Sequence, residues 1–195
     1  KSYEDYYSGY NANILMPNDA NIPDDKKEEY HQIRKTDICS QYFNDGMIFY
    51  SALTNQTNNV LMNNVWGMIT SAASLCLVQL ALKRPIRGGI DIGWGGLLKE
   101  GELYGNSVAS AYILESKIAK YPRIVVSNET VEYLQAIQNQ HRTAERNICV
   151  TVNKKIATRC LKVISSDDDG HFFLDYLGEE FQASVCGQVE EYEKN

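Results

Sequence analysis

Two acidic turns are the places in this 195-residue sequence where side chains have the right chemistry to bind a metal ion. The first turn holds Asp45, between two strand-like runs in QYFNDGMIFYS, residues 41–51. Asp-Gly is a strong signal for a β-hairpin, so turn formation alone accounts for Asp45-Gly46. A carboxylate at a rigid turn is also a good oxygen ligand for a divalent cation. On these residues alone, both interpretations of Asp45 stay open.

The second turn is the run of three aspartates at 167–169, followed by Gly170. Three carboxylates are candidate calcium ligands, but the run lacks the alternating ligands and closing Glu of an EF-hand, so a solvated turn is favoured. The histidines, at 31, 141 and 171, are scattered and form no ligand pair. Because GxSxG, HExxH and P-loop patterns are absent, we name no Ser or Cys nucleophile.

Helices and hairpins of an α+β protein must position these residues. The long helix would bury Trp66, Ile69, Ala73, Cys76, Leu77 and Leu80 on one face, and paired Gly88-Gly89 predicts close approach of another backbone. The predicted elements are a helix remnant and loop over 1–37, a hairpin over 38–53, a helix over 57–82, a strand over 86–93, a loop or loose hairpin over 94–105, a helix over 106–120 that includes Tyr112, a buried strand over 123–127, a helix over 129–140 with Asn128 as N-cap, a basic connector or edge strand over 141–159, a hairpin over 160–177 and a frayed tail.

Composition and charge narrow the class of protein. A chain of this length suits one domain, and we predict a single domain over 1–195. A net charge of −6 argues against a nonspecific nucleic-acid binder. Five cysteines without a CxxC pair predict a reducing cytoplasm rather than disulfides or zinc. The uncharged run over 58–82 contains several Asn, Ser and Gln residues, so we expect a buried helix and no membrane span.

Three segments, in this order, resemble the catalytic domain of class III nucleotidyl cyclases. They are YFNDGMIFYSA, RGGIDIGWGG and LYGNSVASAYILESKIAKYPRIVVS. Three motifs within or near these segments, AYILE, YPRIVVS and DDDGHFFLDYL, resemble those of a divergent bacterial branch of the family. That branch includes the pyrimidine cyclases of Pycsar antiphage defence. The resemblance covers about residues 38–177 and implies a ferredoxin-like cyclase homology domain, with helices packed on a mixed or antiparallel sheet and a terminal hairpin.

The resemblance implies a reaction and an assembly. A nucleoside triphosphate would bind at the interface of a head-to-tail homodimer, with two divalent metal ions (Mn²⁺ or Mg²⁺) as cofactors. The ribose 3′-oxygen would attack the α-phosphorus and release pyrophosphate, each cation stabilising charge on an attacking or departing oxygen. Asp45 would be a metal ligand and catalytic residue. The product would act on a separate effector protein.

Further site residues follow from matching the same segments. Gln41 and Glu102 match the positions that read the base in purine cyclases, and a Gln can pair with a uracil or cytosine edge. Tyr42 or Tyr104 would stack on the base. The positions of the family's catalytic Asn and Arg hold Ala109 and Ile113, and we name Asn106, Tyr112 and Arg87 as substitutes, with Arg87 the best suited to bind phosphate.

The family's first strand, with its other metal aspartate and the phosphate-binding turn, has no match in this sequence. By spacing, those residues would lie at or before Lys1, and the sequence has no initiator Met, so we expect that the first strand has been omitted. The sequence therefore predicts a phosphorus–oxygen lyase that makes cyclic UMP or cyclic CMP in bacterial antiphage defence. The alternatives are an adenylate or guanylate cyclase, and a catalytically inactive relative that binds nucleotide or dimerises.

Overall fold

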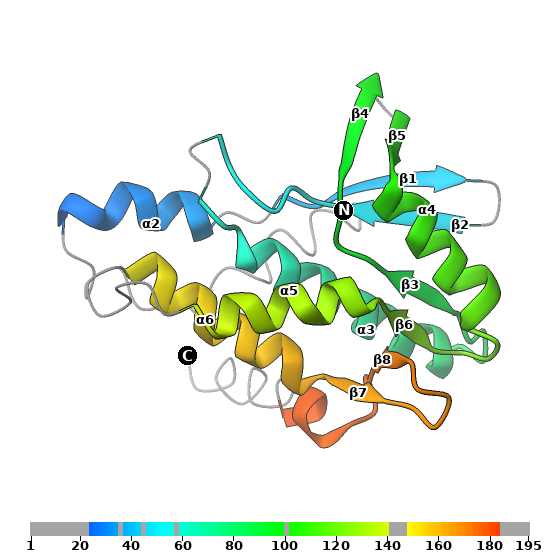
Figure 1. The fold of residues 1–195 in the computed structure, drawn as a ribbon. Coiled ribbons are helices and arrows are strands. Elements are labelled where there is room, and N and C mark those ends of the chain that lie inside the picture. Colours follow the sequence, from blue (N-terminus) through cyan, green and yellow to red (C-terminus); the bar gives the residue numbers. More distant parts are fainter. Residues whose placement is uncertain are drawn as a thin grey trace. The chain divides into compact units, whose positions relative to one another are not determined.

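A computed structural model describes residues 24–34, 37–43, 46–56, 59–99, 102–140 and 148–183, and its helices and strands form an α+β protein, as predicted. Residues 1–71 and 136–160 make one unit, and residues 72–135 and 161–195 make a second. The prediction of a single domain over 1–195 stays a prediction. In chain order (Figure 1), the elements are η2 (Asp24–Lys26), α2 (Lys27–Arg34), β1 (Cys39–Phe43), β2 (Gly46–Tyr50), α3 (Met62–Ala81), β3 (Gly88–Ile90), β4 (Gly95–Lys99), β5 (Glu102–Gly105), α4 (Asn106–Ile113), η3 (Leu114–Ile118), β6 (Ile124–Val126), α5 (Asn128–Gln138), α6 (Ile148–Lys162), β7 (Ile164–Ser166) and β8 (Phe172–Leu174).

The first unit contains the antiparallel β1–β2 hairpin, which confirms the hairpin predicted over 38–53. Asn64, in the first turn of α3, holds the two outer ends of this hairpin. Its Oδ1 accepts from the backbone N–H of Asp37 at 3.1 Å, and its Nδ2 donates to the backbone oxygen of Ala52 at 3.0 Å. Asn64 is 1% exposed, so this contact is a buried polar anchor between helix and hairpin.

The second unit contains a four-stranded mixed sheet in the order β3-β6-β8-β7. Strands β3 and β6 are parallel, whereas β6–β8 and β7–β8 are antiparallel. This result confirms the buried strand predicted over 123–127 and the terminal hairpin over 160–177. The β4–β5 pair forms a separate hairpin that extends away from this sheet (Figure 1). Of the two alternatives predicted over 94–105, a loop or a loose hairpin, the hairpin is therefore correct.

Helix α4 and the π-helical turn η3 pack on β3 at Gly89. A Cβ atom added to Gly89 would lie 2.3 Å from the backbone oxygen of Ala111 and 2.7 Å from Cβ of Leu114. Real Cβ atoms do not approach other atoms so closely, so only glycine allows this packing distance. The prediction that the Gly88-Gly89 pair marks close approach of another backbone is therefore confirmed. Gly89 fixes where α4 lies on the sheet.

Helix α3 is long and apolar enough to cross a membrane by length and composition, but half of its apolar stretch is buried within the protein. This fits the core helix of a soluble protein. Trp66, Ile69, Ala73 and Cys76 are buried, as predicted. Leu80 is 42% exposed, so its assignment to the buried face was wrong, because the last turn of α3 runs beyond the core.

The basic stretch over 141–159 was predicted as a connector or an edge strand, and this was wrong from residue 148 onward, where α6 begins. Cys149, Val152, Ile156 and Cys160 are buried, at a spacing of three or four residues. That spacing is the helical period. The frequent basic side chains around this stripe concealed it in the sequence.

Other predictions changed in detail. The long helix begins at Met62 rather than near residue 57. Helix α5 is capped by Ser127 rather than Asn128, because Ser127 Oγ accepts from the backbone N–H of Thr130 at 3.0 Å. Tyr112, predicted at a helical spacing with buried residues, is 68% exposed. The helix remnant and loop predicted over 1–37 lie partly outside the described residues; α2 falls within that range. The frayed tail and His141 lie outside them.

Candidate functional site

The β1–β2 hairpin carries Gln41 and Tyr42, two of the predicted site residues. Gln41 pairs with Ile48, Tyr42 with Met47, and Phe43 with Gly46. This register leaves two residues, Asn44 and Asp45, between the last paired positions, and both lie outside the described residues. The strands therefore flank Asp45 as the sequence predicted, and the role of Asp45 as a metal ligand stays a prediction.

Gln41 has an unpaired acceptor. Its side-chain oxygen Oε1 is buried and has no hydrogen-bond partner among the described residues. A buried polar atom without a partner is destabilising and calls for an explanation, and a ligand that donates a hydrogen bond is one. Successive side chains of a strand face opposite sides, so the next residue, Tyr42, faces away from Gln41. Tyr42 is 74% exposed.

The predicted site residues of the second unit lie on β5, α4 and the approach to β3. Glu102 and Tyr104 belong to β5, and Asn106 is the first residue of α4. Glu102 and Asn106 are exposed, and Tyr104 is 50% exposed. These three residues are therefore brought together on one exposed strand-to-helix segment. Nothing in the structure relates them to Gln41 and Tyr42, which belong to the first unit.

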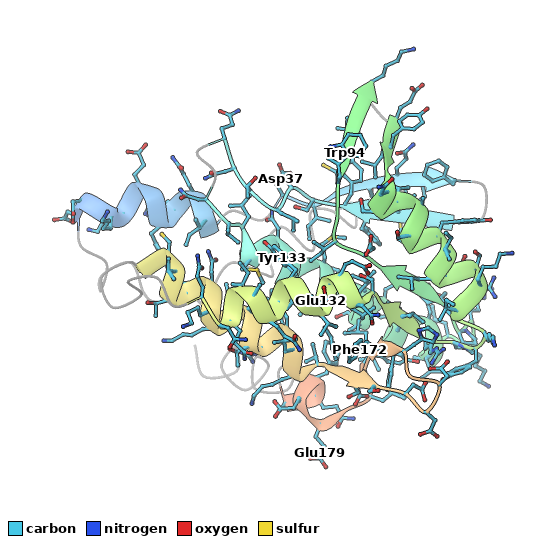
Figure 2. All side chains as sticks on the ribbon, viewed as in Figure 1. Asp37, Trp94, Glu132, Tyr133, Phe172 and Glu179 are labelled. Carbon is cyan, nitrogen blue, oxygen red and sulfur yellow. The ribbon has the colours of Figure 1, made fainter. Side chains whose placement is uncertain are left out.

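A tight turn joins β5 to α4. Gly105 has φ 145°, and a Cβ there would lie 2.4 Å from the backbone oxygen of Trp94. The same Trp94 oxygen accepts hydrogen bonds from the backbone N–H and the hydroxyl of Ser107, at 3.3 and 3.2 Å. The first turn of α4 is thus fastened to the chain entering β4, where Figure 2 shows Trp94 at the base of the hairpin.

Arg87, the predicted phosphate ligand, forms an ion pair with Glu115 in η3. Its Nε lies 2.6 Å from Glu115 Oε1, and the two side chains are 50% and 32% exposed. Exposed pairs of this kind contribute little to stability. The role of Arg87 as a phosphate ligand stays a prediction.

The three-aspartate turn binds an arginine of its own chain. The Arg123 side chain is 3% exposed, and its guanidinium lies 2.6 Å from Asp167 Oδ2 and 2.5 Å from Asp169 Oδ2. The guanidinium also donates to the backbone oxygen of Ile118 at 3.1 Å and stacks over the Tyr121 ring. The sequence favoured a solvated turn over a calcium site, and Asp168 and Asp169 are exposed; what the sequence did not predict is that Asp167 and Asp169 pair with Arg123. Their carboxylates neutralise a buried cation, which is the reverse of a calcium site.

This ion-pair cluster lowers the pKa values of two of its carboxyl groups. Hydrogen bonding from Arg123 lowers the pKa of Asp169 to about 2. Hydrogen bonding from the Tyr121 hydroxyl, with smaller help from the backbone N–H of Asp168 and from Arg123, lowers the pKa of Asp167. Sequence reasoning missed Arg123, although YPR before a strand and DDDG in a later hairpin were both noted. The missing information was that β6 and the β7–β8 turn are neighbours.

Asp91 is a second residue that the sequence reasoning missed. It directly follows β3, and Ser127 directly follows the parallel strand β6, so both lie at the same edge of the sheet. Burial raises the pKa of Asp91, opposed in part by hydrogen bonding from Ser127, the backbone of Ile92 and Ser110. One carboxyl oxygen, Oδ1, is buried and has no hydrogen-bond partner in the part of the chain that the structure describes. An acidic residue within the apolar run GGIDIG was the available signal.

The described residues contain no group of three or more His, Cys, Asp or Glu side chains placed to hold a metal ion. They also supply neither of the two aspartates expected to bind the predicted metals, since Asp45 lies outside them. Both metal ions therefore stay predictions. In comparisons with known proteins, no family model, no curated protein and no solved structure matches this chain.

Proposed function

We propose that this protein is a nucleotide cyclase that converts UTP to cyclic UMP, or CTP to cyclic CMP, with release of pyrophosphate. The observation that carries the proposal is the register of the β1–β2 hairpin, which leaves Asp45 in a two-residue connection between paired strands. In the cyclases that this sequence resembles, a hairpin of this kind carries a metal-binding aspartate. The glycine-bearing strand β3 and the glycine-started helix α4 follow in the order that the resemblance implies.

The protein's own residues would bind and orient the nucleotide. Gln41 would hydrogen-bond the pyrimidine edge through its unpaired Oε1, and Tyr42 or Tyr104 would stack on the base. Glu102 and Asn106 would contact the base or the sugar. Two Mn²⁺ or Mg²⁺ ions, with Asp45 as a ligand, would supply charge stabilisation at the phosphates.

Arg87 would neutralise phosphate charge in this site. Its pair with Glu115 is a surface contact, so exchange of the carboxylate for a phosphate keeps a charge-assisted hydrogen bond at the guanidinium. The exchange would release the Glu115 side chain.

A head-to-tail homodimer fits the exposed apolar side chains of the second unit. Within twenty residues, Trp94, Leu97, Tyr104, Tyr112 and Ile113 are each at least half exposed. Exposed large apolar side chains at this density are typical of a surface that another protein covers. A second copy of the chain is the partner that the resemblance implies, and we place the reaction in the bacterial cytoplasm, where the product would activate a separate effector in antiphage defence.

The test is to incubate the full-length protein with Mn²⁺ and each of the four nucleoside triphosphates in turn and to measure turnover. Cyclic UMP or cyclic CMP, detected by mass spectrometry, would support the proposal, and Asp45→Ala should abolish the product without unfolding the protein. Asp168→Asn, in the exposed turn after β7, is the matched control and should keep full activity. Cyclic AMP or cyclic GMP would instead indicate the purine-specific alternative.

One observation favours the catalytically inactive alternative. Ala109 and Ile113 occupy the positions of the family's catalytic Asn and Arg; Ala109 is exposed and Ile113 is 53% exposed, so neither is a buried replacement. Nucleotide binding without any cyclic product from the four triphosphates would establish a nucleotide-binding or dimerisation module and overturn the enzymatic proposal.

A further inference from the structure

Arg123 contacts the two chain segments that carry the Arg87–Glu115 ion pair. On the strand side, its backbone oxygen accepts from the backbone N–H of Gly88, the residue after Arg87, at 3.1 Å. On the helix side, its Nη2 donates to the backbone oxygen of Ile118, the last residue of η3, at 3.1 Å. One buried residue therefore joins the start of β3 to the end of η3, while the ion pair between these segments lies at the surface.

Acidic partners hold the guanidinium of Arg123 in one orientation. Asp169 accepts from both Nη atoms, at 3.2 and 2.5 Å, and Asp167 Oδ2 accepts from Nη1 at 2.6 Å. The Arg123 side chain is 3% exposed, so water has little access to the guanidinium. A planar fork fixed in this way keeps Nη2 directed at Ile118, where a cation also stabilises the negative end of a helix.

The two arginines differ in what they offer to solvent. Both Nη atoms of Arg123 already donate to protein oxygens within a buried cluster. Arg87 is half exposed and pairs with Glu115 through Nε at 2.6 Å. A ligand from solvent therefore meets Arg87 and not Arg123.

We propose that Arg123 is a positioning residue for Arg87. Its guanidinium holds the end of η3 beside the start of β6, and thereby fixes Glu115 where it orients the Arg87 side chain. The inference rests on the proposed function only where Arg87 serves as a phosphate ligand. Packing at Gly89 also holds η3 on β3, since a Cβ added there would lie 3.1 Å from the backbone nitrogen of Glu115, so the test must separate the two contacts.

The first experiment measures hydrogen exchange by NMR on the whole chain, wild type against Arg123→Lys. Lysine keeps the charge beside the aspartates but lacks the fork that reaches Ile118 at the same time. The Nε–H of Arg87 should exchange about tenfold faster, and so should the backbone N–H of Ala119, which donates to Leu114 at the end of η3. Tenfold is the change expected for the loss of about one hydrogen bond.

Arg84→Lys, at an exposed arginine of the same unit, is the matched control and should leave both exchange rates unchanged. Wild-type rates in Arg123→Lys would overturn the inference, because packing at Gly89 would then be sufficient. A uniform increase that includes the amides of β8 would indicate a general loss of stability and would overturn it as well. If Arg123→Lys does not fold, Asp169→Asn should accelerate the same two N–H groups, and unchanged rates in that protein would be equally decisive against the inference.

The second experiment tests the part that rests on nucleotide turnover. Arg123→Lys should lower kcat/KM for the triphosphate about tenfold, and the same substitution in an Arg87→Ala protein should have no further effect, because Arg123 acts through Arg87. An equal effect in both backgrounds would overturn the link to phosphate binding. A protein that makes no cyclic nucleotide would overturn the proposed function, and the exchange rates would still decide whether Arg123 holds the ion pair.

Discussion

Replacing Gly89 by Ala tests how the sheet positions α4. The added Cβ would lie 2.3 Å from the backbone oxygen of Ala111, whereas ordinary contact begins at 3.4 Å, so α4 and η3 must move away from β3 by about 1 Å. The obstruction includes backbone and cannot be relieved by rotating a side chain. Overpacking of this kind costs up to about 3 kcal/mol. The lower conformational entropy of unfolded Ala offsets about 0.7 kcal/mol, which leaves a loss of ~2 kcal/mol.

Gly88→Ala is the matched control, one residue earlier in the same strand. Its Cβ would lie 3.4 Å from Cγ1 of Ile124, which is ordinary contact, so we expect a change within about 0.5 kcal/mol. Urea unfolding followed by circular dichroism and by tryptophan fluorescence measures both variants. With a slope of about 2 kcal/mol/M, Gly89→Ala should lower the midpoint by about 1 M.

Equal midpoints for Gly89→Ala and Gly88→Ala would refute this reasoning, because it rests on the difference between 2.3 and 3.4 Å. A Gly89→Ala protein as stable as the wild type would show that α4 is free to shift along β3. Coincident transitions by the two probes are needed for the free energies to be comparable.

Three further predictions concern Asn64, Asp169 and Trp94. Asn64→Ala should destabilise by about 2 kcal/mol, because two hydrogen bonds that join α3 to the hairpin are lost, and hydrogen exchange should show the loss of protection in β1–β2. The lowered pKa of Asp169 implies stability that is present above pH ~3.9 and is lost as the pH falls toward 2. The free energy of unfolding should therefore fall more steeply on acidification in the wild type than in Asp169→Asn, which lacks this titrating group. An identical acid dependence in the two proteins would contradict the pairing with Arg123. Trp94→Ser should weaken self-association in sedimentation without lowering the urea midpoint, since its side chain is 75% exposed; unchanged self-association would remove Trp94 from the proposed dimer surface.

Local pattern was enough to predict much of the fold. The Asp-Gly signal and the alternation around it predicted the β1–β2 hairpin, and the apolar run at 123–127 predicted β6. The stripe at Cys149, Val152 and Ile156 was present in the sequence but hidden by basic neighbours, so α6 was missed. Ser127 took the N-cap from Asn128 because the helix begins one residue earlier than the pattern indicated.

Long-range contacts explain most of what the sequence did not predict at the candidate site. Arg123 meets Asp167 and Asp169 across more than forty residues, and Asp91 and Ser127 lie at neighbouring strand ends because β3 and β6 are parallel neighbours. No local spacing contains that information. Gly89 is the exception. The Gly88-Gly89 pair is a local sequence signal, and it correctly predicted that another backbone approaches the strand closely.

The Arg123 cluster also bears on the order of folding. Three adjacent aspartates repel one another, so the β7–β8 hairpin is disfavoured on its own until the guanidinium reaches it. Arg123 precedes β6, which pairs with β8, so the countercharge arrives only when that non-local pairing forms. We expect the C-terminal edge of the sheet to assemble late, with low φ-values at Asp167 and Asp169; values near 1 would mean that the turn closes before its arginine is in place.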